Sequence, residues 1–250
     1  SPSHPELLDW LSNKLVDEFQ WQLKPLIRLM VQSHTYQQKS EVSPRCLEID
    51  PKNTWLSHYS RSRLSAEVIR DQILGTSGLL NREVGGPSVI IPELNIRSSF
   101  IPHWALTDPE HHYRRSLYIF WKRTDPFADM ITFDSPDRTL CTSRRVTTNT
   151  PLQALNLLND EIYFEAAMSM ASVFYQPGEP IDEIVAKMYR HVTLRENTQE
   201  RLDHLMAFYS KMLDSSSVET KTYNKESGEK KALALVANVL YNLDEFVTKS

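Results

Sequence analysis

The chain has 250 residues, of which 40% are hydrophobic and 24% charged, and its formal net charge is −4. This composition is typical of a globular protein and excludes a disordered chain. The mild acidity argues against nucleic-acid binding, which usually requires a basic surface. No apolar run approaches the roughly 20 residues that a membrane-spanning helix needs. Only 6 Gly stand against 14 Pro, which argues against a fold of many hairpins.

The first 80 residues carry apolar side chains at helical spacing. A capping box of Ser3 and Glu6 is predicted to start a helix that continues through Phe19. A polar loop with two prolines is expected at residues 39–53. Two further helices are predicted, at residues 23–38 and 63–80.

The next region, residues 81–147, is irregular and rich in proline and arginine. It contains a strand-like run at 88–91. The aromatic and β-branched run at 115–122 is compatible with a strand, but its place between helices favours a helix. A short helix is expected at 125–131. Irregular segments of this length in a compact domain tend to be functional or mobile.

The strongest local signal is Thr150-Pro151-Leu152-Gln153, a capping box with proline at the first helical position. It predicts a long helix through Tyr175, as part of a central helical region at 148–213. A flexible spacer is expected at 214–229 and a C-terminal helix in residues 230–250. The sequence therefore predicts one compact, mainly α domain over residues 1–250, with the irregular segment lying over one side. The further central helices are predicted at 181–192 and 198–213.

One patch of charge stands out as a candidate site. Between residues 114 and 145 there are seven basic and four acidic side chains, a local net charge of +3. Arginine suits paired contacts with carboxylate, sulfate or phosphate, and the helix beginning near Thr150 has free N–H groups that favour an anion. The patch predicts an anion site for an acidic or sulfated glycan, or alternatively an internal Arg–Asp network. The candidate residues are Arg114, Arg115, Arg123, Asp134, Asp137, Arg138, Arg144 and Arg145.

Other chemistry leaves weaker signals. Cys46 and Cys141 are interpreted as two buried thiols or as one disulfide, and no spacing of Cys or His predicts a metal site. No nucleophile motif or phosphate-binding loop is present, so catalysis stays open. Five charged residues are interpreted as ion pairs on a solvated or interdomain face of the third helix. They are Arg61, Arg63, Glu67, Arg70 and Asp71.

Several strings resemble a C-terminal domain of unknown function found in large planctomycete and verrucomicrobial proteins. The most specific is TNTPLQALNLLND at 148–160. The others are HPELLDWL at 4–11, RSRLSAEVIRD at 61–71, GGPS at 85–88, RRSLYIFWKR at 114–123, FDSPDR at 133–138 and ANVLYNLDEF at 237–246. The resemblance covers nearly the whole chain.

The resemblance implies a context and no mechanism. Such proteins are usually exported, often carry a cytochrome-c-like haem domain upstream, and are often encoded near polysaccharide-degrading or sulfatase genes. We therefore expect an extracytoplasmic location, an upstream domain as partner, and no cofactor in this chain itself. The expected function is a binding or structural module, with a polysaccharide or another anion as ligand. The alternative is half of a composite active site, for redox or polysaccharide chemistry, that the upstream domain completes.

Overall fold

The computed structural model describes residues 2–91, 108–123, 126–136, 138–219 and 225–249. Within these ranges the chain is mainly helical, with eleven α-helices and two strands of two residues each. The predicted mainly α fold is therefore confirmed. Contacts divide the chain into two compact units, an N-terminal unit (Ser1–Ser62 with Thr248–Ser250) and a C-terminal unit (Arg63–Val247).

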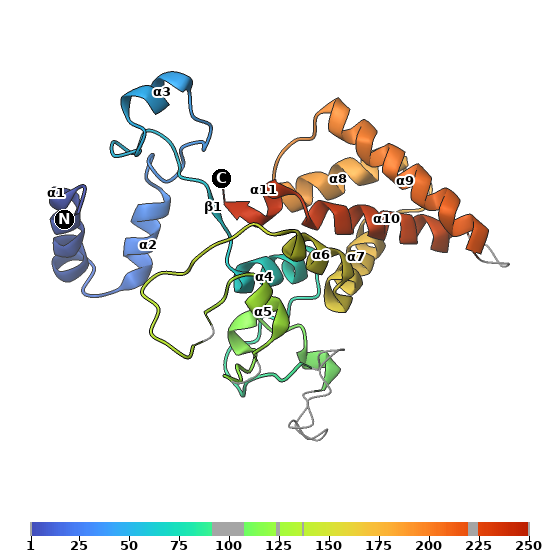
Figure 1. Ribbon diagram of the computed structural model, residues 1–250, viewed down its shortest axis with the longest axis horizontal. Helices are drawn as coiled ribbons and strands as arrows, with labels where there is room; N and C mark the ends of the chain where they lie inside the picture. Colours follow the sequence, from blue (N-terminus) through green and yellow to red (C-terminus); the bar gives the residue numbers. More distant parts are fainter. Residues whose placement is uncertain (1, 92–107, 124–125, 137, 220–224, 250) are drawn as a thin grey trace. The chain divides into compact units, whose positions relative to one another are not determined.

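The N-terminal unit is built from short helices (Figure 1). They are α1 (Pro5–Asn13), the π-helical turn η1 (Lys14–Glu18), α2 (Leu23–Val31) and α3 (Pro44–Ile49). Pro5 begins α1 because its missing N–H would have no partner in the first turn. The predicted capping box of Ser3 and Glu6 is wrong, since His4 is the N-cap residue and makes no side-chain cap bond.

Two boundaries of the N-terminal unit differ from the prediction. Helix α2 ends at Val31 and not near residue 38, because the Ser33 hydroxyl donates to the Met30 carbonyl at 2.7 Å and accepts from the Tyr36 amide. Such local side-chain bonds compete with the helix. Helix α3 lies in the predicted loop 39–53, where Ser43 caps it by accepting from the Cys46 amide at 3.2 Å.

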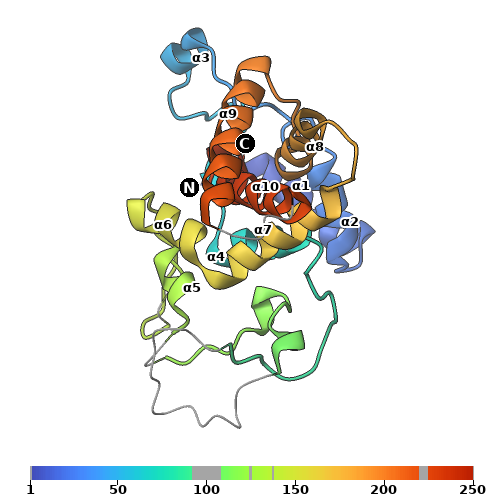
Figure 2. The ribbon, with the colours of Figure 1, turned by 90° about the vertical axis from the view of Figure 1, so that its right-hand side faces the viewer.

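The C-terminal unit contains the remaining helices (Figure 2). Two short strands pair with each other in a two-stranded sheet, β1 (Ser62–Arg63) and β2 (Thr248–Lys249), of which β2 and Ser62 belong to the N-terminal unit. The helices are α4 (Ala66–Thr76), the 3-10 turns η3 (Pro109–His111) and η4 (Ser116–Tyr118), α5 (Ala128–Thr132), α6 (Pro151–Asn159), α7 (Glu161–Phe174), α8 (Ile181–Thr193), α9 (Gln199–Glu219), α10 (Lys225–Tyr241) and α11 (Asp244–Val247). None of the described helices is long and apolar enough to cross a membrane.

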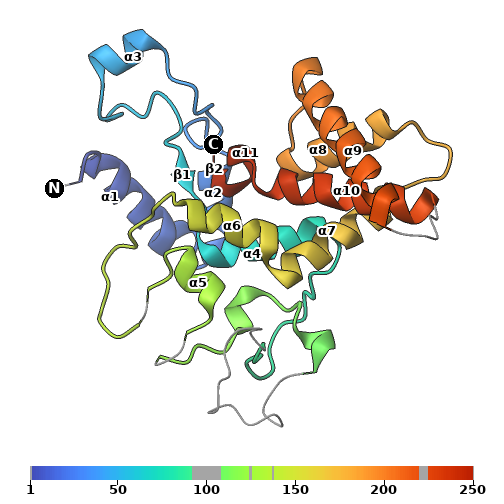
Figure 3. The same cartoon turned by 45° about the vertical axis from the view of Figure 1, so that its right-hand side comes forward.

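The core of this unit lies where α10 packs against α7, α8 and α9 (Figure 3). Alanines on α7 and α10, such as Ala167 and Ala234, are fully buried. Because alanine is small, the two helix backbones come close, and larger side chains fill the flanks. Helix α4, which packs against α7, adds Ile69 and Ile73 to the same core.

The predicted long helix at 152–175 is two helices, α6 and α7. They are separated at Asp160, whose backbone is extended (φ −63°, ψ 134°) and whose carboxylate accepts from the Tyr163 amide at 3.1 Å. The side chain of Asp160 thus caps α7, as aspartate at an N-cap position commonly does. The continuous apolar pattern hid this break, which determines where the Asp160 carboxylate lies.

Other expected elements also changed. The runs at 88–91 and 115–122 form neither a strand nor a long helix: Val89 and Ile119 share a single parallel bridge, and only residues 116–118 form a 3-10 turn. The predicted spacer at 214–229 is wrong for its described part, because α9 extends to residue 219 and α10 begins at residue 225. The short helix expected at 125–131 is α5, which begins at Ala128.

Candidate functional site

Arg114 is a structural residue of the irregular segment. Its side chain is buried, and its guanidinium donates to the carbonyls of Pro87, at 3.0 Å, and Gly85. The same guanidinium lies 4.0 Å over the ring of Tyr118, whose hydroxyl accepts from the Gly85 amide at 2.7 Å. Gly86, at φ +82°, lets the backbone pass close to Arg114. Arg114 therefore holds the 85–87 loop by hydrogen bonds.

The other arginines of the patch have different surroundings. Arg145 makes a two-pronged contact with Glu67 of α4, at 2.7 and 2.9 Å, and Arg115 lies 3.8 Å from Asp71. Arg138 stacks on the ring of Trp121 at 4.8 Å. Arg123 and Arg144 are exposed.

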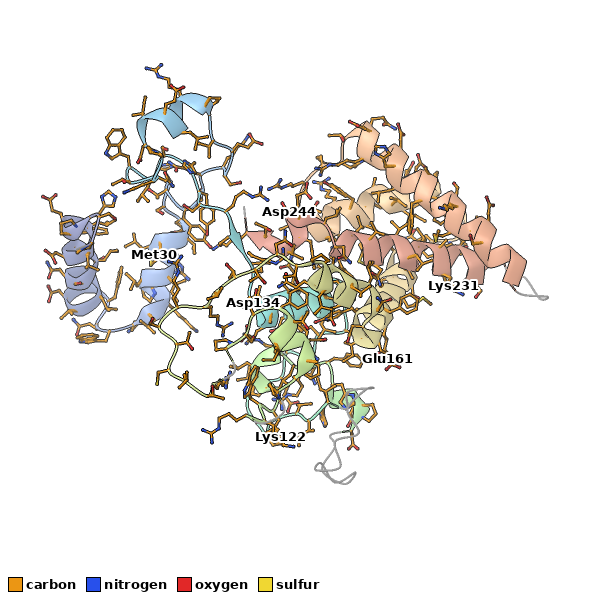
Figure 4. The ribbon with its side chains drawn as sticks, viewed as in Figure 1. Met30, Lys122, Asp134, Glu161, Lys231 and Asp244 are labelled. Atoms are coloured by element: carbon orange, nitrogen blue, oxygen red, sulfur yellow. The ribbon has the colours of Figure 1, made fainter. Side chains whose placement is uncertain are left out.

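The acidic members of the patch are Asp134 and Asp137. Asp134, which Figure 4 labels, accepts from the amide of Thr148 at 2.6 Å and from the Gln153 side chain at 3.3 Å. Asp137 lies outside the described residues. In the described contacts the arginines thus have separate partners, and anion binding by the exposed ones stays a prediction.

The helix that begins after Thr150 is capped as predicted. The Thr150 hydroxyl accepts from the Gln153 amide, and the Gln153 side chain accepts in return from the Thr150 amide. Gln153 is fully buried and also donates to the carbonyl of Thr132 at 3.0 Å. The capping box therefore ties the start of α6 to the end of α5.

A cluster of charged side chains lies beneath the irregular segment. Its arginine among the described residues is Arg70 of α4. Arg70 is 1% exposed and donates to the carbonyls of His112, at 2.5 Å, and Arg114, at 3.0 Å. Its neighbour Asp71 accepts from the Ser116 amide at 2.6 Å. Helix α4 thus fixes the 112–116 loop with two consecutive charged residues.

Two carboxylates complete this cluster. Asp129 of α5 is buried and accepts from the Asn156 side chain of α6 at 2.9 Å. Asp160 stands at the break between α6 and α7. Tyr163, on the first turn of α7, is buried beside the half-buried Asp160, and its hydroxyl interacts with both carboxylates. The cluster therefore joins α4, α5, α6 and α7.

The electrostatics follow from burial. Burial raises the pKa of Asp129, against hydrogen bonds from Asn156 and Tyr163 and the charge of Arg70. Burial and the negative charge of Asp129 together raise the pKa of Asp160 to about 6. Burial also raises the pKa of Tyr163 and lowers that of Arg70. The cluster therefore holds a carboxyl group able to take up or release a proton near neutral pH.

The sequence placed two residues of this cluster wrongly. Arg70 and Asp71 were expected on a solvated or interdomain face, yet Arg70 is fully buried and both fix a loop. Asp129 was counted only among the four acidic residues of the segment 114–145, and Asp160 was not singled out. The signal for Asp160 was the polar pair Asn159-Asp160 within an apolar helical pattern, because aspartate favours the start of a helix over its interior.

Neither cysteine is buried. Cys46 is half-buried, Cys141 is exposed, and both are free thiols. Among the described residues, no group of three or more His, Cys, Asp or Glu side chains is arranged to hold a metal ion.

A pocket of about 600 Å³ opens beside the turn between α7 and α8, lined by residues 175–181 with Glu226 and Glu229 of α10. The Tyr175 hydroxyl donates to Glu229 at 2.7 Å, and the Lys230 ammonium lies 5.0 Å from the centre of the Tyr175 ring. Glu179 accepts from Lys187. Tyr175, Glu229 and one oxygen of Glu179 therefore have partners within the protein, whereas the other carboxylate oxygen of Glu179 is buried without a hydrogen bond.

The N-terminal unit differs from the C-terminal unit in burial. Over residues 2–62 only Asp50 is buried, and no hydrophobic side chain is. Figure 4 labels Met30, which lies on α2 and is 48% exposed. We call the exposed apolar side chains of α1, η1, α2 and the turn between them the arm surface. It consists of Leu7, Leu8, Trp10, Val16, Trp21, Leu23, Ile27, Met30 and Val31.

Comparison with known protein families gives a match. The model of the family PSD1, described as a protein of unknown function (DUF1553), matches residues 1–209. The chain belongs to the DUF1553 family. No curated protein and no solved structure matches it.

The DUF1553 match spans the arm surface, the arginine patch and the buried cluster. It confirms the expected resemblance to a domain of unknown function. For this DUF1553 domain, the upstream haem domain, the export and the composite active site stay predictions.

Proposed function

We propose that this DUF1553 domain is a binding module that docks onto another polypeptide through the arm surface. The observation that carries the proposal is the exposure of the large apolar side chains in residues 2–62, which include Trp21 at 69% and Leu23 at 62%. Apolar patches of this extent on soluble proteins mark interaction sites. The resemblance to exported multidomain proteins supports a place in a larger extracytoplasmic assembly.

The arrangement of the arm surface supports a docking role over a core role. On α2 the residues Leu23, Ile27, Met30 and Val31 follow the spacing of one helical stripe, and all four are exposed. A helix with such a stripe gains its stability from packing against another element. A partner polypeptide with an apolar face supplies that packing.

The test is an apolar fluorescent dye added to the full chain at low concentration. We expect strong dye fluorescence, and a large loss of it in the triple variant Leu23→Gln/Ile27→Gln/Met30→Gln with unchanged helix content. Val173→Gln, at an exposed apolar position on α7, is the matched control and should change little. If a chain that sediments as a monomer binds no dye, or if dye binding is the same in wild type and triple variant, the proposal is wrong.

A second candidate function is binding of an anionic glycan by the arginine patch. Exposed guanidinium groups at Arg123, Arg138 and Arg144 favour it, because arginine pairs well with sulfate and carboxylate. Titration with a sulfated oligosaccharide should show binding that the Arg144→Ala/Arg145→Ala double variant weakens. Arg190→Ala, at an exposed arginine of α8, is the control. Equal binding by wild type and double variant, with folding intact, would contradict this candidate.

A further inference from the structure

The two helical parts of the arm surface carry opposite charge. Helix α1 with η1 has four acidic residues and one basic residue, so its net charge is 1 − 4 = −3. Helix α2 has two basic residues, Lys24 and Arg28, and no acidic one. The acidic residues are Glu6, Asp9, Asp17 and Glu18, and the basic one is Lys14.

Each of these helices also presents apolar side chains to solvent. On α1, Leu7 and Trp10 are three residues apart and therefore share a face, each 47% exposed. On α2 the exposed stripe passes through Ile27 at 55%. Lys24 and Arg28, one residue away from Leu23 and Ile27, flank this stripe. Both helices thus combine an apolar centre with a charged rim, which is the usual composition of an interface.

Opposite charge on two such helices makes the arm surface complementary to itself. In a twofold dimer the same patch is used by both chains, so that α1 of one chain meets α2 of the other, twice. That pairing places the net charge of −3 on α1 with η1 against the net charge of +2 on α2 at each contact. A contact of α1 with α1, or of α2 with α2, would place like charges together. Charge complementarity of this kind selects partner and orientation.

We propose that the partner of the arm surface is a second copy of this chain, bound so that α1 of each protomer lies against α2 of the other. The inference rests on the proposed function, since it names the polypeptide that the arm surface binds. It concerns only α1, η1 and α2, whose residues are all described.

The first test is sedimentation of the full chain from low to high micromolar concentration. We expect a monomer–dimer equilibrium that Ile27→Gln weakens at least tenfold, while Val173→Gln leaves it unchanged. Helix content by circular dichroism should be the same in all three proteins. A dimer that is insensitive to Ile27→Gln would overturn the inference, because it would use a different surface.

The second test exchanges the charges. Variant A carries Lys24→Glu and Arg28→Glu on α2, and variant B carries Glu6→Lys and Asp9→Lys on α1. Alone, each should associate more weakly than wild type, because α1 and α2 then have the same sign. Mixed together, A and B should form a heterodimer, since both α1–α2 contacts regain opposite charge. Failure of the mixture to associate, when wild type does, would overturn the proposed pairing.

The outcomes also separate this inference from the proposed function. A chain that stays monomeric at all concentrations and still binds the dye has an uncovered arm surface with a different partner, such as an upstream domain. That result contradicts the inference that the partner is a second copy, and it is consistent with the proposed binding function. A monomer that does not bind the dye overturns both.

Discussion

At the scale of single residues, the arginines of one short segment differ in what they stabilise. Arg114 and Arg144 are both arginine, 30 positions apart, and the sequence grouped them in one patch. Arg114 is 5% exposed and donates hydrogen bonds to two loop carbonyls, whereas Arg144 is exposed. Burial of the Arg114 side chain decides the difference, because its removal loses packing as well as two hydrogen bonds, whereas Arg144 is solvated.

Removal of each side chain should therefore have different costs. Arg114→Ala leaves the Gly85 and Pro87 carbonyls without their donor and removes the stacking on Tyr118, so we expect a loss of about 3 kcal/mol in the free energy of unfolding. Arg144→Ala should change it by less than about 0.5 kcal/mol, as surface substitutions usually do. Urea denaturation of both variants measures this. Equal losses would show that Arg114 does not hold the loop.

The raised pKa of Asp160 predicts a dependence of stability on pH. Its pKa in the fold is about 6, above the ordinary value of 3.8, so the folded chain binds a proton more tightly than the unfolded chain. Stability from this group is then greatest at low pH and declines as pH rises between about 4 and 6. At neutral pH the half-buried charge of Asp160 costs up to about 3 kcal/mol, at about 1.4 kcal/mol per pKa unit.

Asp160→Asn should remove this cost and keep the cap, because asparagine is also a good N-cap residue. We expect the variant to be more stable than wild type at pH 7.5 and to show a flatter pH profile between pH 4 and 7. Asp160→Ala also loses the hydrogen bond from the Tyr163 amide, so its stability at pH 7.5 should increase less. Thermal unfolding across this pH range gives the comparison, and a wild-type slope retained in Asp160→Asn would refute the assignment.

At the scale of elements, the junction between α5 and α6 depends on the Thr150 capping box and on Gln153. Thr150 contributes a cap bond at an exposed site, so Thr150→Ala should cost about 1 kcal/mol. Gln153 is fully buried and serves the cap, the Thr132 carbonyl and Asp134 together.

Gln153→Ala should therefore cost clearly more than Thr150→Ala, about 3 kcal/mol, because it leaves buried polar groups without partners. Leu152→Ala, at an exposed position of the same turn, is the control. Chemical denaturation of the three variants measures the free energy of unfolding of each. If Thr150→Ala and Gln153→Ala lowered the free energy of unfolding by similar amounts, the junction would depend on the helix cap alone.

At the scale of the whole molecule, burial is unequal between the two units. The C-terminal unit holds all the buried hydrophobic side chains of the described residues, most of them on α7, α8 and α10. Amide hydrogen exchange should follow this difference, because resistance to local opening depends on buried contacts. At concentrations where the chain is monomeric, amides of α7 and α10 should exchange slowest, and those of α1, α2 and α3 fastest. Equal protection of α2 and α10 under these conditions would show that the N-terminal unit has a covered core.

The sequence by itself determined the fold class and most helices. Apolar spacing of 3.6 residues located α4, α8 and α9, and the Thr150-Pro151 start of α6 was correct to the residue. These features are local: a cap, a proline at the first position or an apolar stripe acts within a few residues. The same locality explains the family resemblance, which rested on short strings.

Only the tertiary structure decided which charged residues are buried. Arg70 and Asp129 are buried and Asp160 is half-buried, although they come from segments that are distant along the chain, and this burial raises the pKa of both carboxylates. Arginines 114, 144 and 145 are close in the sequence and still have separate surroundings. Likewise, the apolar stripe of α2 predicted a helix, but only the structure showed that the stripe is exposed. Burial depends on contacts between remote segments, and sequence spacing along one segment carries no record of them.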